Sequence, residues 1–137
     1  MAAPTPVVTV LGDSNELAII KVTVPAGGDT DVSATIAGDV SALTSGATHT
    51  NLNIMRVQWS ANFSFNLFFD ATTDDHALTL AKGSGDLDFS ALANGIKNPR
   101  SSGVTGDVLF TTLGIADTEE DVKDSGFMIL YLQKNTI

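Results

Sequence analysis

Apolar and polar residues alternate along most of this chain, and this period of two constrains the fold more than any other feature of the sequence. The clearest stretch is Asn53–Leu80, which holds the only Trp and four of the seven Phe. Successive side chains of a β-strand point to opposite faces of a sheet, so a half-buried strand shows this alternation. We therefore expect two or three antiparallel strands here, at the centre of a β-sheet protein. The alternating apolar sets are Met55, Val57 and Trp59, followed by Phe63, Phe65, Leu67 and Phe69.

Three further segments show the pattern of strands most clearly. Leu17–Val24 and Asp31–Ala37 alternate, which predicts one buried face for each. Phe127–Lys134 begins apolar on both faces, which is typical of a central strand that is buried on two sides. The expected inward sets are Ala18, Ile20, Val22 and Val24 in the first segment, and Val32, Ala34 and Ile36 in the second.

Shorter segments complete the expected set of strands and turns. Glycine and Asp/Asn clusters mark the turns between them. Lys82–Asp86 reads as a glycine turn, and Ser60–Asn62 as a hairpin turn, with a bulged or continuous strand as the alternative. Val40–Leu43 and Ala91–Ile96 each fit one helical turn. The other expected strands are Val7–Leu11, His76–Leu80, Leu87–Phe89 and Thr105–Thr112.

Eight or nine short strands separated by such turns predict an all-β fold, an antiparallel, jelly-roll-like β-sandwich. Long amphipathic helices between the strands are missing from the pattern, which disfavours an α/β fold. A chain of 137 residues is long enough for one domain with its own core. We expect that domain at residues 7–137, after an extended N-terminal arm at residues 1–6 that contains Pro4 and Pro6.

The composition disfavours several classes of partner. Sixteen acidic residues against seven basic ones give a net charge of −9, so no basic surface is expected for nucleic acid or for an anionic membrane. No apolar run approaches the roughly 18 residues of a spanning helix. Charged residues make up 17% of the chain. This share is below the usual quarter, which indicates a partly neutral surface that partners cover.

The segment Asp70–Asp75 is the best candidate for a metal site. Asp70, Asp74 and Asp75 could offer oxygen ligands to Ca²⁺. The spacing, the central Gly and the closing Glu of an EF-hand are missing, and aspartates also form ordinary turns. The sequence therefore favours a turn, and we expect no metal and no other cofactor.

Candidate catalytic residues are few. His49 and His76 lie outside any metal-binding spacing, and no GxSxG motif accompanies them. Asp86 and Asp88 would share one face of a strand, as a glycosidase pair does, but neither has an apolar pocket to raise its pKa. An enzyme would need Asp70, Asp86 and His76 to converge in one cleft. We therefore expect no catalytic residue.

The N-terminal segment is the best candidate for binding a partner. Pro4 and Pro6 favour an extended path, and Val7 and Val8 follow them directly. Such a segment either frays or adds onto a neighbouring subunit. The loops at Gly38–Asn51 and at residues 98–104 are further candidates, because long loops often bind or cover something.

Three segments together resemble small virion proteins of tailed bacteriophages. The resemblance covers roughly residues 53–134 and rests on a Trp strand that leads into a DATTDD-like turn, a glycine turn before a DF step, and a final aliphatic strand that ends in Lys. These motifs are structural rather than catalytic. The segments are WSANFSFNLFFDATTDDHALTLAKGSGDLDFS, IKNPRSSGVTGDVLFTT and FMILYLQK.

This resemblance implies a capsid decoration, or cement, protein that binds the outside of the phage shell and stabilises it. Its expected partners are the major capsid protein and other copies of itself, with a trimer as one candidate. The protein would be made in the host cytoplasm and would end on the capsid surface of the virion. The alternative is a tail- or fibre-associated module that binds a host glycan, for which the aromatic residues offer stacking surfaces, or that joins tail subunits.

Overall fold

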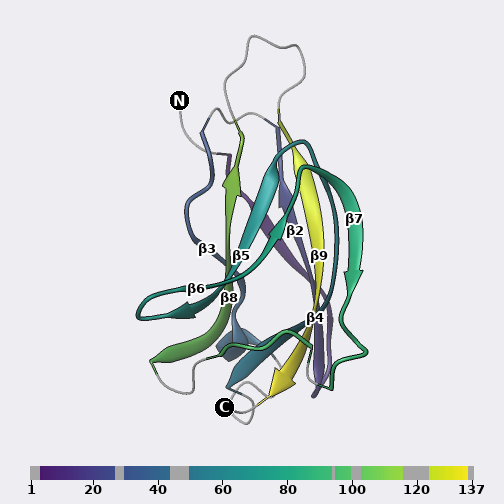
Figure 1. Ribbon diagram of the computed structural model, residues 1–137, viewed down its shortest axis with the longest axis vertical. Coiled ribbons are helices and arrows are strands. Elements are labelled where there is room, and N and C mark those ends of the chain that lie inside the picture. Colours follow the sequence, from purple (N-terminus) through teal and green to yellow (C-terminus); the bar gives the residue numbers. More distant parts are fainter. Residues whose placement is uncertain are drawn as a thin grey trace.

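Two antiparallel sheets pack face to face in this protein (Figure 1). The computed structural model describes residues 4–26, 30–43, 50–93, 95–99, 103–115 and 124–135. A 3-10 turn, η1 (Val40–Ala42), follows the third strand. The strands are β1 (Val7–Asp13), β2 (Leu17–Val24), β3 (Thr35–Gly38), β4 (Asn51–Ala61), β5 (Ser64–Ala71), β6 (Asp75–Leu80), β7 (Gly83–Asp88), β8 (Val104–Leu113) and β9 (Gly126–Asn135).

The strand order is that of a jelly roll with one additional strand. The five-stranded sheet has the order β1-β2-β9-β4-β7, and the four-stranded sheet has the order β3-β8-β5-β6. Without β1, four strands face four strands, and the chain passes between the sheets as in two Greek keys. The predicted fold class, a jelly-roll-like antiparallel β-sandwich of eight or nine strands, is therefore confirmed.

The core lies between the two sheets and is built by the alternation that the sequence shows. In β2, the predicted inward residues from Ala18 to Val24 are all at most 1% exposed. β9 lies between β2 and β4, which confirms its predicted central position. The predicted burial on two sides is wrong, because only alternate residues are buried and Phe127 is 36% exposed. Three phenylalanines pack edge to face in the middle of the core, with ring centroids 5.0 Å apart for Phe63 and Phe65 and 6.1 Å apart for Phe65 and Phe110.

The third strand differs from its prediction. It spans only Thr35–Gly38, and Ile36 is 44% exposed while Ala37 is buried. The register shifts between Ile36 and Gly38, so a bulge at Ala37 reverses which residues face the core. Of the predicted inward set, Val32 is buried, but Ala34 and Ile36 are exposed.

A second bulge changes β4. The register with β9 shifts between Ile54 and Arg56, which leaves Met55 as the additional residue. Val57 and Trp59 therefore share a face with Ile54 instead of with Met55. Four consecutive residues, Asn51–Ile54, are buried before the bulge. The chain then turns into β5 of the opposite sheet, so the expected hairpin at Ser60–Asn62 is a corner between the sheets.

Two predicted turns are also wrong. Four of the five residues of the expected glycine turn lie in β7, which pairs with β4 from Ala61 to Arg56. The described residues of Ala91–Ile96 form no helix, and two backbone hydrogen bonds connect this segment, from Leu92 N to Phe89 O and from Gly95 N to Leu92 O. Gly95 has φ +59°, and Ile96 then pairs with Ile54 across an isolated bridge.

A buried lysine joins the end of β9 to the turn after β1. The side chain of Lys134 is fully buried, and its Nζ donates to the Asp13 carboxylate and to the Ser14 carbonyl. A buried ammonium requires such partners because desolvation otherwise disfavours its charge. The contact therefore fixes the β1–β2 turn against the centre of the sheet.

Candidate interaction surface

The additional strand β1 leaves apolar side chains uncovered. A sheet of five strands faces a sheet of four, and the edge strand β3 of the smaller sheet contacts β2. β1 therefore extends beyond its covering layer. Its inward residues Val8 and Val10, which pair with Val22 and Ile20, are 41% and 51% exposed.

These valines belong to a row of exposed aliphatic side chains at one edge of the sandwich, which we call the aliphatic edge. Val8, Val10 and Ile36 line one groove on the inner side, whereas Val7 pairs with Thr23 and lies on the outer side. Several exposed aliphatic residues along one edge are typical of an interaction site. The aliphatic edge consists of Val7 (53% exposed), Val8, Val10 and Leu11 (54%) from β1 and Ile36 (44%) from β3.

A groove runs along the inner side of the aliphatic edge. Its volume is about 270 Å³, and Val8, Val10 and Ile36 form its mouth. Buried core residues form its floor, so an apolar side chain that enters the groove reaches the core itself. The remaining lining residues are Ile20, Ala37, Asp39, Ala42 and Leu43.

Among the residues that the structure describes, no strand pairs with the outer edge of β1. β1 is the terminal strand of its sheet, and it pairs with β2 along its other edge. Proteins usually protect such edges with Lys or Pro, but Val7–Gly12 contains neither. A bulge between Val10 and Gly12 twists only the far end. The edge from Val7 to Val10 therefore remains suitable for pairing with another strand.

Acidic groups border the groove at η1. Asp39 caps this turn, because its Oδ1 accepts from Ser41 N at 3.1 Å and from Ser41 Oγ at 2.6 Å. Asp107 accepts the Val40 N–H at 2.9 Å. Burial raises the pKa of the Asp107 carboxyl, and the charges of Asp39 and Asp70 raise it further. This end of the groove is therefore negative, whereas the β1 end is neutral.

The sequence predicted two residues of the aliphatic edge and missed three. Val7 and Val8 are exposed at the open strand, as a partner-binding site needs. Pro4 is instead buried against its own domain, and Pro6 is half-buried, while residues 1–3 of the expected arm lie outside the described residues. The missed residues are Val10, Leu11 and Ile36.

The predicted metal candidates take part in a turn and its flanking strands. Asp70 accepts from Thr105 Oγ1 at 2.8 Å, and Asp74 Oδ1 accepts from Ala71 N at 3.1 Å. Asp75 lies in β6 and pairs with Phe69. Among the described residues, no three His, Cys, Asp or Glu side chains form a group that could hold a metal.

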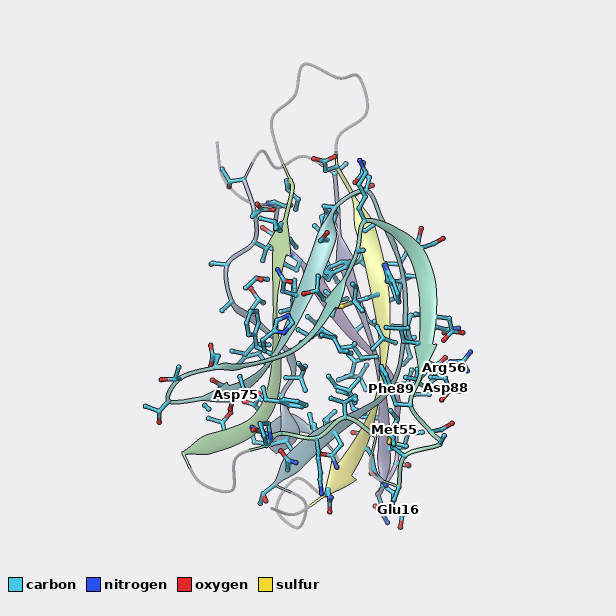
Figure 2. All side chains as sticks on the ribbon, viewed as in Figure 1. Glu16, Met55, Arg56, Asp75, Asp88 and Phe89 are labelled. Atoms are coloured by element: carbon cyan, nitrogen blue, oxygen red, sulfur yellow. The ribbon has the colours of Figure 1, made fainter. Side chains whose placement is uncertain are left out.

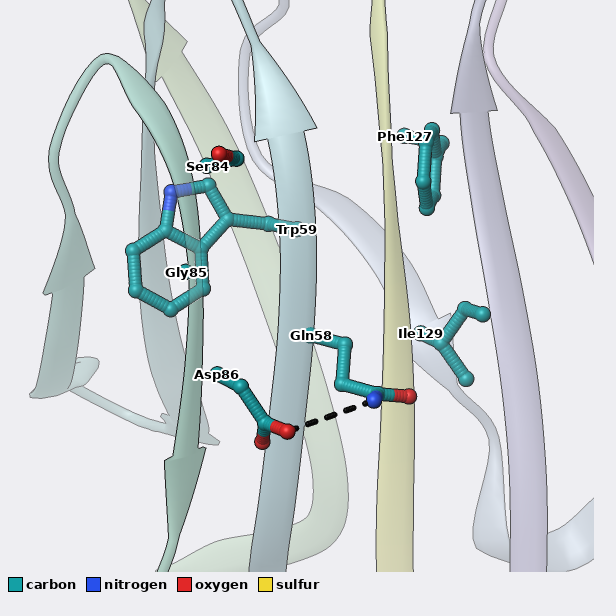
Figure 3. A pocket seen from close by; sticks show the side chains of 7 residues that line it. All are labelled: Gln58, Trp59, Ser84, Gly85, Asp86, Phe127 and Ile129. Atoms are coloured by element: carbon teal, nitrogen blue, oxygen red, sulfur yellow. Dashed lines mark hydrogen bonds between the residues drawn. The ribbon is translucent and has the colours of Figure 1, made fainter.

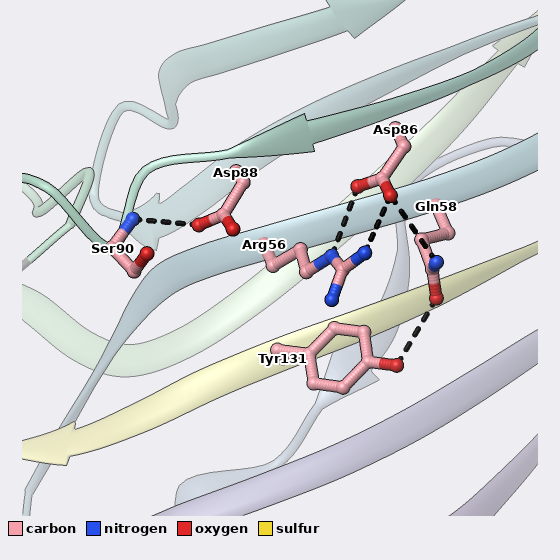
Figure 4. A network of polar contacts seen from close by, with 6 residues as sticks. All are labelled: Arg56, Gln58, Asp86, Asp88, Ser90 and Tyr131. Carbon is pink, nitrogen blue, oxygen red and sulfur yellow. Dashed lines mark hydrogen bonds and ion pairs between the residues drawn. The ribbon is translucent and has the colours of Figure 1, made fainter.

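Asp86 and Asp88 lie on the outer face of the five-stranded sheet (Figure 4). Asp86 binds Arg56 through two contacts, Nε–Oδ1 at 3.0 Å and Nη2–Oδ2 at 2.6 Å, and Gln58 through a third at 3.3 Å. Hydrogen bonds from Arg56 lower the pKa of Asp86, and those from Ser90 lower the pKa of Asp88. A glycosidase acid needs a raised pKa, so this pair has the opposite property.

The three residues that an enzyme would bring together do not converge. His76 pairs with Phe68 on the outer face of the four-stranded sheet and bonds Thr79 Oγ1 at 2.8 Å. Asp86 faces outward from the other sheet. Figure 2 shows the same separation for two labelled residues, with Asp75 beside one sheet and Asp88 beside the other. His49 lies outside the described residues.

The single Trp serves packing at the edge of the five-stranded sheet. Its ring lies across Gly85, where glycine is the residue that leaves room for it (Figure 3). Its Nε1–H donates to Ala81 O at 2.9 Å. A shallow, open depression beside it is lined by Gln58, Phe127 and Ile129. Trp59 is therefore engaged within the domain.

No protein-family model matches the chain, and no curated protein matches it. Among solved structures, the chain is similar to a cupin domain from Bordetella pertussis Tohama I. The two are 14% identical over 96% of this chain and 97% of that domain, with a TM-score of 0.33. A likeness of this size supports no inference about function, and the fold class rests on the strand order itself. The described part of the chain contains no helix with the length and hydropathy of a membrane crossing.

Proposed function

We propose that this chain is a structural virion protein that binds the outside of a phage capsid and stabilises the shell, as a decoration or cement protein. The observation that carries the proposal is the aliphatic edge, where five aliphatic side chains stand exposed beside an unprotected strand. Such a surface is stabilised when another protein covers it, and it offers no group for chemistry. The proposed role is therefore assembly, without catalysis.

Two further features support this role. Jelly rolls occur in viral capsid proteins and in cupins alike, so the fold alone favours neither. The addition of β1 to the eight-stranded jelly roll is more informative, because this strand adds exposed apolar surface. The net charge of −9 would favour an approach to basic patches on the major capsid protein.

The binding free energy that burial of the aliphatic edge can contribute fits a repeating lattice better than an isolated complex. Complete burial of one Val, Leu or Ile contributes about 1.5–3 kcal/mol, so five half-exposed residues contribute about 4–7 kcal/mol. Association of two free proteins costs about 4–15 kcal/mol. A single copy of this edge therefore binds weakly, but many copies on a shell benefit from high effective concentration.

The test uses virions of the phage that encodes the chain, with and without its gene. Particles that lack the protein should lose DNA at a lower temperature than complete particles. Addition of purified protein should restore their heat resistance. Negative-stain imaging would follow the state of the heads. Deficient particles with normal heads and unchanged heat resistance would contradict the proposal.

A matched pair of variants tests whether the aliphatic edge matters. Val10→Lys places a charge on the edge, and Leu113→Lys places the same charge on an exposed residue of β8 that is 64% exposed. We expect Val10→Lys to weaken binding to deficient heads by at least tenfold and Leu113→Lys to leave it unchanged. Labelling of tails instead of heads would favour the tail-associated alternative.

A further inference from the structure

We propose that the open edge of β1 pairs with β1 of a second copy of this chain, antiparallel and around a two-fold axis at Thr9. This inference rests on the proposed function and deepens it, because it names the partner that covers the aliphatic edge. The pairing joins two five-stranded sheets into one continuous sheet across the dimer.

The sequence of the edge is self-complementary. Val7–Leu11 reads Val-Val-Thr-Val-Leu. Thr9 is at the centre, a valine lies on each side of it, and an aliphatic residue lies at each end, so the order is the same in both directions. In an antiparallel pair centred on Thr9, Thr9 opposes its own copy, and Val8 opposes Val10. Leu11 lies at the bulge between Val10 and Gly12, so the regular part of the pair is Val8–Val10. A two-fold interface requires this kind of match, in which each residue meets its counterpart twice.

The same register places the correct side chains on the correct face. Val8 and Val10 face inward and line the mouth of the groove. Residues directly opposite in a sheet share a face, so Val8 and Val10 of the second copy continue this apolar row. The row then covers the mouth of both grooves. A register shifted by one residue would oppose inward valines to outward residues, which the period of two forbids.

The charge distribution permits this pairing in spite of the net charge. The nearest charged residue on β1 is Asp13, four positions from Thr9. The two copies of Asp13 would lie roughly 26 Å apart along the sheet at about 3.3 Å per residue. Lys21 pairs with Thr9 inside each copy, and the two copies of Lys21 would lie roughly 14 Å apart across three strand spacings. Both separations exceed the screening length of about 8 Å in physiological salt.

A single-cysteine variant tests the position of the axis, because the natural chain has no cysteine. Directly opposed residues have Cα atoms about 4.5–5.5 Å apart, within the range of about 4.4–6.8 Å for a disulfide. Thr9→Cys should therefore form a covalent dimer under mild oxidation. Val7→Cys should not, since the two copies of residue 7 are offset by four positions. The double variant Val8→Cys/Val10→Cys should form the dimer again, because Val8 opposes Val10 within the regular part of the strand.

A further variant tests whether cross-links form by random collision of exposed cysteines. Leu113→Cys is more exposed than any residue of the aliphatic edge and should remain monomeric on a non-reducing gel. Equal rates of cross-linking at Thr9, Val7 and Leu113 would overturn the proposal. So would the absence of a Thr9→Cys dimer at millimolar protein concentration.

Sedimentation equilibrium of the unmodified chain gives an independent measurement. We expect a reversible dimer, which Val10→Lys weakens by at least tenfold and Leu113→Lys leaves unchanged. Circular dichroism confirms that each variant is folded. Where Val10→Lys does not fold, Val8→Lys serves in its place. A chain that stays monomeric at all concentrations would contradict the inference.

The inference and the proposed function can fail separately. A protein that binds heads but does not cross-link through Thr9→Cys, in solution or on the particle, retains the function and loses the two-fold pairing. A protein that cross-links through Thr9→Cys but never binds heads retains the pairing and loses the virion role.

Discussion

Gly85 should be intolerant of any side chain, although it lies in an edge strand where glycine is usually replaceable. A Cβ atom at this position would lie 2.5 Å from Cη2 and 2.7 Å from Cζ2 of Trp59. Both distances are shorter than van der Waals contact, so Gly85→Ala must displace the indole ring. A displaced ring also loses the hydrogen bond from its Nε1–H to Ala81 O.

The expected loss follows from three contributions. Overpacking costs about 1–3 kcal/mol. The lost hydrogen bond costs about 1 kcal/mol, while the lower entropy of alanine in the unfolded chain contributes about 0.4–1 kcal/mol in the opposite direction. We expect Gly85→Ala to lower the free energy of unfolding by about 2 kcal/mol. For a domain of this size, that change lowers the melting temperature by roughly 6–10 °C.

Urea denaturation followed by tryptophan fluorescence measures this effect, because Trp59 is the only Trp. The native emission of Gly85→Ala should also shift to the red as the ring enters water. Gly12→Ala is the matched control, since Gly12 lies in the opposite edge strand and its Cβ would meet Ile19 Cδ1 at 3.7 Å, an ordinary van der Waals contact. The control should be neutral or slightly stabilising. Equal stability and equal emission for Gly85→Ala and the natural chain would refute the reasoning.

Three further substitutions test other parts of the structure. Burial raises the pKa of Asp107 above its unfolded value, so its ionised form destabilises the fold as the pH rises through the folded pKa. Asp107→Asn keeps an acceptor for Val40 N and should stabilise by under about 1 kcal/mol at pH 7 but not at pH 3, as urea titrations at both pH values would show. Lys134→Met should cost about 3 kcal/mol in thermal unfolding, near the lower end of the range for a broken buried pair, because Asp13 keeps some contact with water. Phe65→Ala should cost about 3–5 kcal/mol in urea denaturation, since Phe65 is fully buried between two aromatic rings.

The sequence predicts the straight strands of this fold well. β2 alternates without interruption, and each of its inward residues reaches the core. The apolar run of β9 predicts its place between β2 and β4, although its outer face is only partly buried. In both strands the side-chain period continues unbroken from one end to the other. Alternation then translates directly into burial.

The bulged strands could not be predicted in the same way. One additional residue at Met55 or Ala37 reverses the face of every residue on one side of it. The bulge is a property of the pairing with β9 or β8, and the sequence of the strand itself does not show it. Gly85 likewise fits a turn by sequence, because its reason for being glycine, the contact with the Trp59 ring, depends on the pairing of β7 with β4.

The candidate site was predictable in part. The run Val7–Leu11 lacks a protecting charge or proline, and this signal could have extended the predicted site from Val7 and Val8 to Val10 and Leu11. The exposure of Ile36 depends on the bulge in β3. The exposure of Val8 and Val10 depends on the number of strands in the facing sheet, which comes from the whole topology.

The central position of β9 has a consequence for folding during synthesis. Both neighbours of β9 precede it in the chain, so neither β2 nor β4 can complete its pairing until the ribosome has delivered residues 126–135. A nascent chain therefore holds two unfinished sheet edges through most of translation, and such edges promote aggregation. We expect the folding of the nascent chain to depend on chaperones, which the yield of folded protein with and without added chaperones would show.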